Sequence, residues 1–349
     1  MSTQTLLDPT ATRMYAEAQE AGEAVARQFA ANADAVDDLT DYLRQRPPRF
    51  IVTCARGSSD HAATYGKYLF ETQLGLVTAS ASPSVGSVYA VRPQLDGALF
   101  VAISQSGKSP DLLRNAEIAK AAGAHVLALV NVLDSPLAGL ADTVLGLHAG
   151  PETSVAATKS YLCSLSALLQ LTARWSNDAA LFNAVHELPD ALRASFAQDW
   201  SPLVEGLVGA RNLFVIGRGL GLGAAQEAAL KFKETCGLHA EAFSSAEVKH
   251  GPMAIVGPGF PVLAFAQDDG TGDSTVAVAE EFRSRGAPVW LAAPGRGGAG
   301  SLPLARSLHP AMTPLLTVAS FYKAANALSV ARGHNPDLPP HLNKVTETV

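Results

Sequence analysis

Short apolar runs and helical patterns alternate along most of this chain. Runs rich in Val, Ile and Leu, such as 99–103 and 213–216, fit strands that are buried on both faces. Between such runs, residues 110–122 and 275–285 carry apolar positions at helical spacing. This alternation predicts βαβ units built around parallel sheets.

The pattern also contains an internal duplication. Arg-Gly pairs at 56–57 and 218–219 each follow an apolar run and precede a helical pattern, and they lie 162 positions apart. The apolar run at 99–103 aligns with that at 262–266, displaced by 163 positions. We therefore expect an α/β fold of two tandem, doubly wound halves, each with a parallel sheet flanked by helices.

The pattern divides the chain into five segments. Leading helices end at Pro47-Pro48, and we expect them to pack on the first half. The expected segments are N-terminal helices at 1–48, a first α/β domain at 49–175, a helical connector at 176–200, a second α/β domain at 201–333 and a C-terminal tail at 334–349.

Composition and charge exclude several classes of protein. With 349 residues, 48% of them hydrophobic, the chain is long enough for two domains with full cores. A net charge of −6 argues against a nucleic-acid partner or an anionic membrane. The cysteines, Cys54, Cys163 and Cys236, are too widely spaced for a zinc motif or a disulfide framework. With no signal peptide and no apolar run of ~20 residues, we expect a cytoplasmic protein without metal, cofactor or membrane partner.

Two polar turns follow adjacent predicted strands and indicate a phosphate site. Hydroxyl and backbone N–H groups at helix starts bind a phosphate monoester without metal. The alternative for the second turn is an ordinary helix cap, since Ser followed by Pro and Asp is common there. Two such turns at neighbouring strand ends favour the phosphate site. The candidate residues are Gly57, Ser58 and Ser59 in the first turn, and Ser104, Gln105, Ser106 and Ser109 in the second.

The glycine-containing motifs of the sequence do not favour nucleotide binding. The Gly-Lys-Ser/Thr of a mononucleotide P-loop is absent. Gly219-x-Gly221-x-x-Ala224 matches the looser dinucleotide fingerprint, but the next strand ends at Ala266-Gln267 instead of an acidic residue.

Candidate catalytic residues gather in the segment 222–251. Lys231 and Glu234 lie three apart, on one face of an alanine-rich helix that we expect to end at Gly237. A solvated ion pair is the alternative for these two residues. His250 is flanked by turn residues, which favours an exposed imidazole over a core histidine.

Four motifs together resemble the sugar isomerase (SIS) family, and in particular the isomerase part of glutamine:fructose-6-phosphate aminotransferase. They occur in the family's order and spacing from Arg49 to the end of the chain. The resemblance implies two SIS domains, each with a five-stranded parallel sheet, and a homodimer with a shared active site. The motifs are SQSGKSPDL, PETSVAATKSY, EAALKFKETCGLHAEAFSSAEVKHGPM and HLNKVTETV.

The resemblance also implies roles for individual residues. The serine and glutamine side chains named above would hold a sugar phosphate, with Ser109 at a position where the family often has Thr. Glu234 would shuttle a proton, Lys231 would be its neighbouring lysine, and His250 would assist ring opening from the partner subunit. Lys344 would be the lysine that can form a Schiff base with a ketose phosphate. Val155 and Asn343 would line the sugar.

One departure from the aminotransferase shapes the expected reaction. Its glutaminase domain begins with a nucleophilic cysteine, whereas the second residue here is Ser2, and no such domain fits ahead of Arg49. We therefore expect a glucosamine-6-phosphate deaminase that releases fructose 6-phosphate and ammonia. Alternatives are an ammonia-dependent synthase, a galactosamine-6-phosphate deaminase/isomerase, a fructosamine-6-phosphate deglycase and a non-enzymatic sugar-phosphate sensor.

Overall fold

The computed structural model describes residues 7–344 of the chain. Ser2 and positions 345–349 of the expected tail lie outside the described residues. Within them the chain forms two compact units. The N-terminal unit comprises 23–151 and 160–186, and the C-terminal unit comprises 7–22, 152–159 and 187–344.

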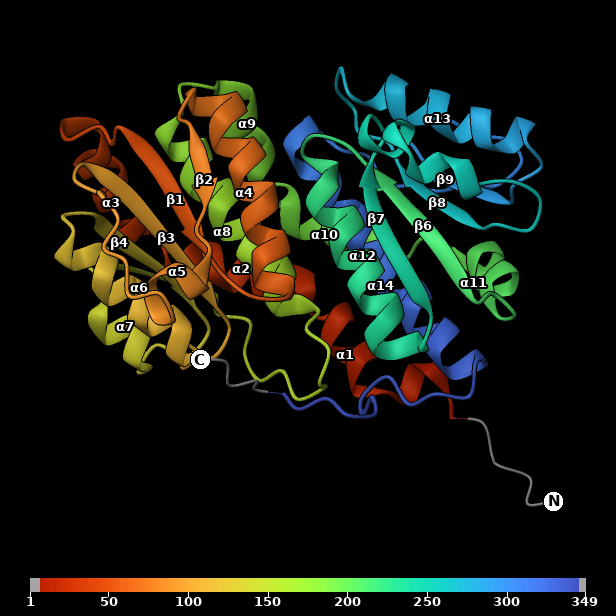
Figure 1. Cartoon of the computed structure of the whole chain (residues 1–349), viewed down its shortest axis with the longest axis horizontal. Helices are drawn as coiled ribbons and strands as arrows, with labels where there is room; N and C mark the ends of the chain where they lie inside the picture. Colours follow the sequence, from red (N-terminus) through yellow and green to blue (C-terminus); the bar gives the residue numbers. More distant parts are fainter. Residues whose placement is uncertain (1–6, 345–349) are drawn as a thin grey trace. The chain divides into compact units, whose positions relative to one another are not determined.

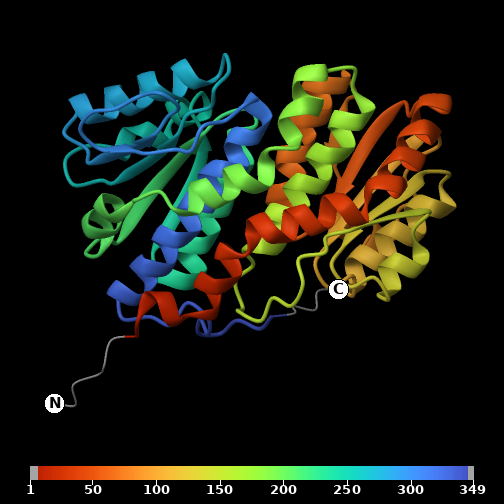
Figure 2. The same ribbon diagram turned by 180° about the vertical axis from the view of Figure 1, so that it is seen from behind.

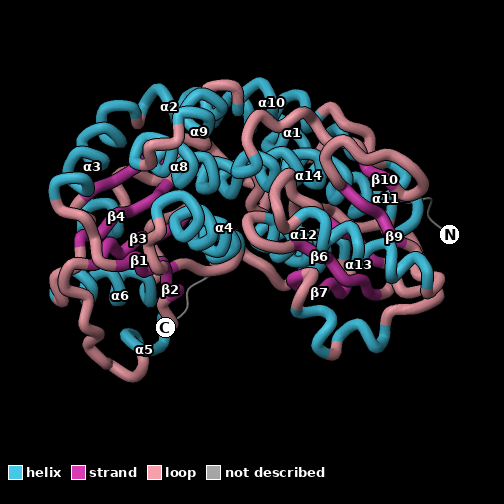
Figure 3. Tube along the Cα trace, turned by 90° about the horizontal axis from the view of Figure 1, so that it is seen from above, coloured by secondary structure: helices cyan, strands magenta, loops and turns pink. Residues whose placement is uncertain are grey.

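The N-terminal unit is a three-layer α/β structure (Figure 1). Its parallel sheet has the strand order β2-β1-β3-β4-β5. One face is covered by α4 and α8 and the other by α6, as Figure 3 shows. The strands are β1 (Phe50–Cys54), β2 (Thr78–Ser80), β3 (Ala98–Ser104), β4 (His125–Val130) and β5 (Thr143–Gly146). The helices are α2 (Ala21–Ala31), α3 (Ala33–Gln45), α4 (Ser58–Leu74), α5 (Pro83–Ser87), α6 (Pro110–Ala121), α7 (Pro136–Leu140), α8 (Lys159–Trp175) and α9 (Ala179–Val185).

The C-terminal unit repeats this architecture. Its parallel sheet has the order β10-β9-β8-β6-β7, with α12 and α14 on one face and α13 on the other. The strands are β6 (Asn212–Gly217), β7 (His239–Ser244), β8 (Val262–Phe265), β9 (Val289–Ala292) and β10 (Ser301–Leu302). The α-helices are α1 (Arg13–Gln19), α10 (Leu188–Phe196), α11 (Ser201–Leu207), α12 (Gly221–Cys236), α13 (Gly272–Ser284) and α14 (Thr313–Ala331). Short 3₁₀ turns are η1 (Pro9–Ala11), η2 (Glu247–His250), η3 (Pro252–Ile255) and η4 (Pro310–Met312).

The two sheets confirm the predicted pair of doubly wound halves. Read from β2 and from β7, they have the same strand order, and the duplicated apolar runs form the matching strands β3 and β8. All residues of these two strands are buried, because helices cover both faces of each sheet. The connector is helical, as expected, with α9 and α10.

The leading helices do not all pack on the first half, and for α1 that expectation is wrong. Met14 and Ala18 are buried where α1 packs against α14 in the C-terminal unit (Figure 2). The Asp337 carboxylate accepts hydrogen bonds from the backbone N–H groups of Arg13 and Met14 at 2.9 and 2.8 Å. It therefore satisfies orphan donors at the start of α1, which the apolar spacing alone does not reveal.

No helix among residues 7–344 is long and apolar enough to cross a membrane.

Candidate active site

The expected phosphate-binding residues lie in two neighbouring turns of the N-terminal unit. One turn joins β1 to α4, and the other joins β3 to α6. Strands β1 and β3 are adjacent and parallel, and the strand order reverses between them. In a doubly wound sheet this switch point is where ligands bind, beyond the carboxyl ends of the strands.

The second turn is held by its own serines. The Ser104 hydroxyl is buried and accepts a hydrogen bond from the Gly107 N–H at 3.1 Å. The Ser106 hydroxyl accepts one from the Lys108 N–H at 3.3 Å. Ser109 occupies the N-cap position of α6, but its side chain makes no capping hydrogen bond. The conventional cap is therefore not formed, and Gln105, Ser106 and Ser109 remain partly exposed.

The first turn presents backbone donors. Gly57 precedes α4 with a φ of +56°, and Ser58 and Ser59 are the first two residues of the helix. Because the first N–H groups of a helix have no intrahelical acceptor, this helix start is suited to an anion. Both serines are partly exposed.

The candidate proton shuttle belongs to a buried charge cluster on α12. Lys231 is fully buried, its ammonium group lies 3.5 Å from Glu227 Oε1, and it also pairs directly with the Glu234 carboxylate. The Tyr322 hydroxyl donates to Glu227 Oε1 at 2.9 Å from the neighbouring helix α14. The expected ion pair of Lys231 and Glu234 is therefore mostly shielded from water, unlike an ordinary surface pair.

Lys231 is charged in this environment. Burial alone would lower the pKa of its ammonium group, but Glu227, Glu234 and Glu152 outweigh burial and raise that pKa above its ordinary value. An ammonium group of this kind stabilises negative charge on neighbouring carboxylates.

Lys344 forms an ion pair with Glu152, and both residues belong to the C-terminal unit that contains Lys231. The Lys344 Nζ lies 3.0 Å from Glu152 Oε2, and the other carboxylate oxygen accepts from the Thr158 N–H at 2.9 Å. The Glu152 side chain is fully buried, whereas Lys344 is 25% exposed. Since Glu152 also acts on the pKa of Lys231, the structure brings Lys231, Glu234 and Lys344 into one electrostatic group.

The segment 152–159 is anchored by helix α1. Glu17 accepts a hydrogen bond from the Ser154 N–H at 3.2 Å, and Glu20 pairs with the buried Lys159 at 2.7 Å. The Val155 N–H donates to the Asp337 carbonyl at 3.3 Å, so Val155 meets the tail that carries Lys344. Asn343 is exposed on that tail.

His250 stands apart from this cluster. It is exposed at the end of η2, and no hydrogen bond or ion pair joins it to Lys231, Glu234 or Lys344 within residues 7–344. Gly251 follows with a φ of +139°, which ends the turn.

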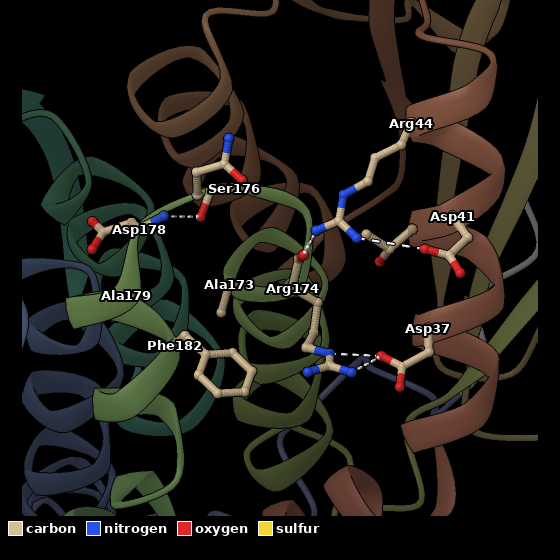
Figure 4. A pocket seen from close by; sticks show the side chains of 11 residues that line it. Asp37, Asp41, Arg44, Ala173, Arg174, Ser176, Asp178, Ala179 and Phe182 are labelled. Carbon is tan, nitrogen blue, oxygen red and sulfur yellow. Dashed lines mark hydrogen bonds and ion pairs between the residues drawn. The ribbon is translucent and has the colours of Figure 1, made fainter.

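The cavity in Figure 4 contains none of the expected site residues. Its volume is about 450 Å³, and α3, the end of α8 and the start of α9 line it. Arg174 Nε lies 2.6 Å from Asp37, and Arg44 contacts Asp41 at 3.5 Å, so these guanidinium groups already face carboxylates. This cavity is therefore a poor candidate for the substrate site.

Neither a metal site nor a reactive thiol is evident in the part of the chain that the structure describes. No group of three or more His, Cys, Asp and Glu side chains there is arranged to hold a metal ion. Cys54, Cys163 and Cys236 are free and buried. Burial raises the pKa of the Cys54 thiol to about 12 and that of Cys236 to about 11, so both thiols are protonated at neutral pH.

The architecture and these residues define a class of protein with two duplicated α/β halves, a serine-rich turn at the switch point of the first sheet, and a cluster of carboxylate and ammonium groups. The SIS domain model matches residues 46–174 and 206–292. The chain belongs to the SIS domain family.

Three similar proteins illustrate the range of the family. Glutamine--fructose-6-phosphate aminotransferase [isomerizing] from Symbiobacterium thermophilum is 34% identical over 322 residues, covering 86% of this chain and 52% of that protein. The chain thus spans about half the length of the curated relatives it matches. A crystal structure from Silicibacter pomeroyi DSS-3, provisionally described as a phosphosugar isomerase, is 45% identical with a TM-score of 0.90, covering 93% of this chain and all of the other. The C-terminal domain of glucosamine-fructose-6-phosphate aminotransferase from Francisella tularensis is 26% identical with a TM-score of 0.82, covering 94% and 98%.

Sequence reasoning missed three members of the cluster. Glu227 lies one helical turn before Lys231, so the spacing alone could have indicated it. Glu152 lies within the PETSVAATKSY motif but was not singled out. Tyr322 comes from a long buried helix, and no sequence signal distinguishes it from an ordinary core tyrosine.

Proposed function

We propose that this protein is an aldose–ketose isomerase that deaminates amino-sugar phosphates, with glucosamine 6-phosphate as its substrate. The serine turns would bind the phosphate, and Glu234 would move the proton. The observation that carries the proposal is the exposure of Glu234. Its side chain is 22% exposed, whereas those of Glu227 and Glu152 are fully buried. Of these carboxylates, only Glu234 is open to a ligand.

The chemistry needs one base. After the ring opens, Glu234 removes the proton from C2 of the sugar and returns it to C1, through an enolamine intermediate. The product is an imine at C2, and water hydrolyses it to fructose 6-phosphate and ammonia. A base on one face of the planar intermediate can reach both C1 and C2, so a single carboxylate can carry out both proton transfers. Lys231 would hold the Glu234 carboxylate in place through their ion pair.

We assign His250 to ring opening from the partner subunit of a homodimer. Its exposure supports a role in another copy's site, as does the lack of a hydrogen bond or ion pair to the Lys231 cluster among residues 7–344. Asn343 and Val155 would line the sugar, and Lys344 would provide a cation or a Schiff base near the carbonyl.

The deaminating direction is the leading hypothesis because it needs only the amino-sugar phosphate and water, whereas synthesis also needs a supply of ammonia. The experiment is to incubate the purified protein separately with glucosamine 6-phosphate, galactosamine 6-phosphate and fructoselysine 6-phosphate. Ammonia, lysine and ketose phosphate are measured. Ammonia and fructose 6-phosphate in equal amounts from the first substrate alone are the expected result.

Other outcomes identify the alternatives. Turnover of galactosamine 6-phosphate indicates the deaminase/isomerase for that epimer, and release of lysine indicates a deglycase. Formation of glucosamine 6-phosphate from fructose 6-phosphate and ammonium, with no measurable reverse reaction, indicates a synthase. Binding without turnover of any substrate would refute an enzyme and favour a sugar-phosphate sensor.

A further inference from the structure

Arg56 and Asp111 form an ion pair across the two turns of the N-terminal unit. Arg56 Nε and Nη2 lie 2.8 and 2.7 Å from the same carboxylate oxygen, Asp111 Oδ2. The Asp111 side chain is fully buried, whereas that of Arg56 is 49% exposed. The carboxylate thus fixes one edge of the guanidinium group, and Nη1 forms no hydrogen bond or ion pair within residues 7–344.

The pair lies at the switch point of the sheet. Arg56 directly precedes Gly57 and the start of α4, and Asp111 is the second residue of α6, two positions after Ser109. The ion pair therefore ties together the two turns that carry the candidate phosphate ligands. Asp111 Oδ1 also accepts a hydrogen bond from the Leu112 N–H at 2.8 Å, which holds the carboxylate in a single orientation.

The duplicated half offers an internal comparison. Arg218 follows β6 as Arg56 follows β1, and its Nη1 donates to the Ser274 hydroxyl at 3.1 Å. Ser274 lies 163 positions after Asp111, so the second half keeps the arginine but replaces the buried carboxylate with a hydroxyl. At the same displacement, Asp268 and Asp269 stand where the first half has Gln105 and Ser106. Two carboxylates at these positions would repel an anion. An arginine paired with a buried carboxylate is therefore found in the half with the serine turn, and not at the equivalent Arg218.

We propose that Arg56 is a phosphate-binding residue that Asp111 holds in place, so that the free edge of its guanidinium group pairs with the substrate's phosphate. The inference rests on the proposed function, which places a sugar phosphate at these turns. A guanidinium fork matches the geometry of phosphate oxygens and keeps its charge at every physiological pH. Lys cannot replace it fully, because an ammonium group cannot bind Asp111 through two donors and still present a second edge.

The test is isothermal titration of the full chain with fructose 6-phosphate and with inorganic phosphate. Arg56→Gln alone would remove the cation that pairs with the buried Asp111 carboxylate, so the main variant is Arg56→Gln/Asp111→Asn, with folding checked by circular dichroism. We expect at least about a tenfold loss of affinity for both ligands, because a charge-assisted hydrogen bond to the phosphate is removed. In a turnover assay KM should rise by a similar factor, while kcat stays within about threefold.

Arg218→Gln is the matched control and should bind both ligands as the wild type does. The affinity of Arg56→Lys for both ligands should lie between that of the wild type and that of the double variant. Binding by the folded double variant within about twofold of the wild type would overturn the role of Arg56 and leave the proposed function standing. A wild type that binds neither ligand would refute the phosphate site itself, and the role of Arg56 with it.

Discussion

The ammonium group of Lys231 lies 3.5 Å from the carboxylate of Glu227, and both side chains are buried. This single cation also pairs with Glu234, while Lys344 pairs with Glu152. Three carboxylates therefore face two ammonium groups, and the most exposed of the three is Glu234. The arrangement keeps Lys231 charged and leaves Glu234 as the one of these three carboxylates that is partly exposed.

Glu234→Gln should abolish most of the isomerase activity. The amide preserves the shape of the side chain but cannot accept a proton from C2. Loss of a general base lowers the rate by about 10²–10⁴-fold, so kcat for glucosamine 6-phosphate should fall by at least about 10². Binding of fructose 6-phosphate, measured by calorimetry, should change little.

Glu241→Gln provides the control for that loss. Glu241 is an exposed carboxylate on β7 of the same unit, so its replacement removes the same charge outside the cluster. Both variants should fold as the wild type does. A Glu234→Gln protein with wild-type kcat would exclude Glu234 as the base.

Lys231→Met should destabilise the fold as well as the activity. The substitution leaves the buried Glu227 carboxylate without its cation, and breaking a buried pair in this way costs about 3–5 kcal/mol. The Tyr322 hydroxyl, 2.9 Å from Glu227, compensates only in part. Urea unfolding followed by circular dichroism measures the loss.

The companion variant is Lys231→Met/Glu227→Gln, which also removes the buried negative charge that Lys231 faces in the wild type. It should recover at least about 1 kcal/mol relative to Lys231→Met, because the residual amide is neutral and can accept from Tyr322. If the double variant is no more stable than the single one, the pair does not carry the destabilisation.

Lys231 should also determine how the free energy of unfolding falls at alkaline pH. Lys231 has a pKa above its ordinary value of 10.5 in the folded protein, because Glu227, Glu234 and Glu152 outweigh the effect of burial. As the pH rises, the unfolded chain loses this proton first. The stabilisation is therefore complete below about pH 10.5 and is lost as the pH rises through the folded-state pKa.

Unfolding free energies measured from about pH 9 to about pH 11.5 test this dependence. The unfolding free energy of Lys231→Met should decline less steeply across that range than that of the wild type. Lys233→Met, on the exposed side of the same helix, should follow the wild-type slope. Parallel slopes for the wild type and Lys231→Met would contradict the assignment.

The sequence predicted the sheets well because their signal is local and repeated. The Arg-Gly pairs at 56–57 and 218–219 mark equivalent turns, and the apolar strands beside them are buried on both faces. Helix α1 was misplaced because its apolar spacing shows that it packs, but not against which element. The contact that decides this is the Asp337 carboxylate, which lies more than three hundred positions away.

The site was predictable only in its locally encoded parts. Lys231 and Glu234 could be paired from their spacing on one helix, and the structure shows that contact. Glu152 and Tyr322 reach the cluster from distant segments: Glu152 lies within a family motif that does not reveal its contact with Lys344, and Tyr322 resembles any core tyrosine. Glu234 is partly exposed whereas Glu227 is buried, and this difference depends on tertiary packing that residue spacing does not encode.

Gly107→Ala should disturb the phosphate turn more than Gly57→Ala. Both glycines have positive φ, +64° and +56°. At Gly107 a new Cβ would lie 2.2 Å from the Ser135 hydroxyl and 2.6 Å from its Cβ, whereas at Gly57 nothing lies within 4 Å. Gly57→Ala should therefore lose about 1–3 kcal/mol from backbone strain alone, because its φ of +56° and ψ of −132° are unfavourable for a residue with a Cβ, and Gly107→Ala should add the clash with Ser135.

Thermal unfolding of the two variants, with phosphate affinity measured in parallel, checks this contrast. Gly107→Ala should also weaken binding of inorganic phosphate, because Ser104 positions the turn through the Gly107 N–H. Equal stability of the two variants would show that the turn can move away from Ser135.

Glu152→Gln should change the reactivity of Lys344. The buried Glu152 carboxylate lies 3.0 Å from Lys344 Nζ and holds this side chain in place, whereas a Schiff base requires the same nitrogen to reach the carbonyl carbon of the substrate. Incubation with fructose 6-phosphate and borohydride, followed by peptide mass spectrometry, detects a Schiff base at Lys344. If the ion pair controls this reactivity, the adduct at Lys344 should form faster in Glu152→Gln than in the wild type at neutral pH. Lys344→Met should give no adduct at that position. An unchanged trapping rate in Glu152→Gln would leave Glu152 a structural anchor of the tail, and a wild type without any adduct would assign Lys344 an electrostatic role.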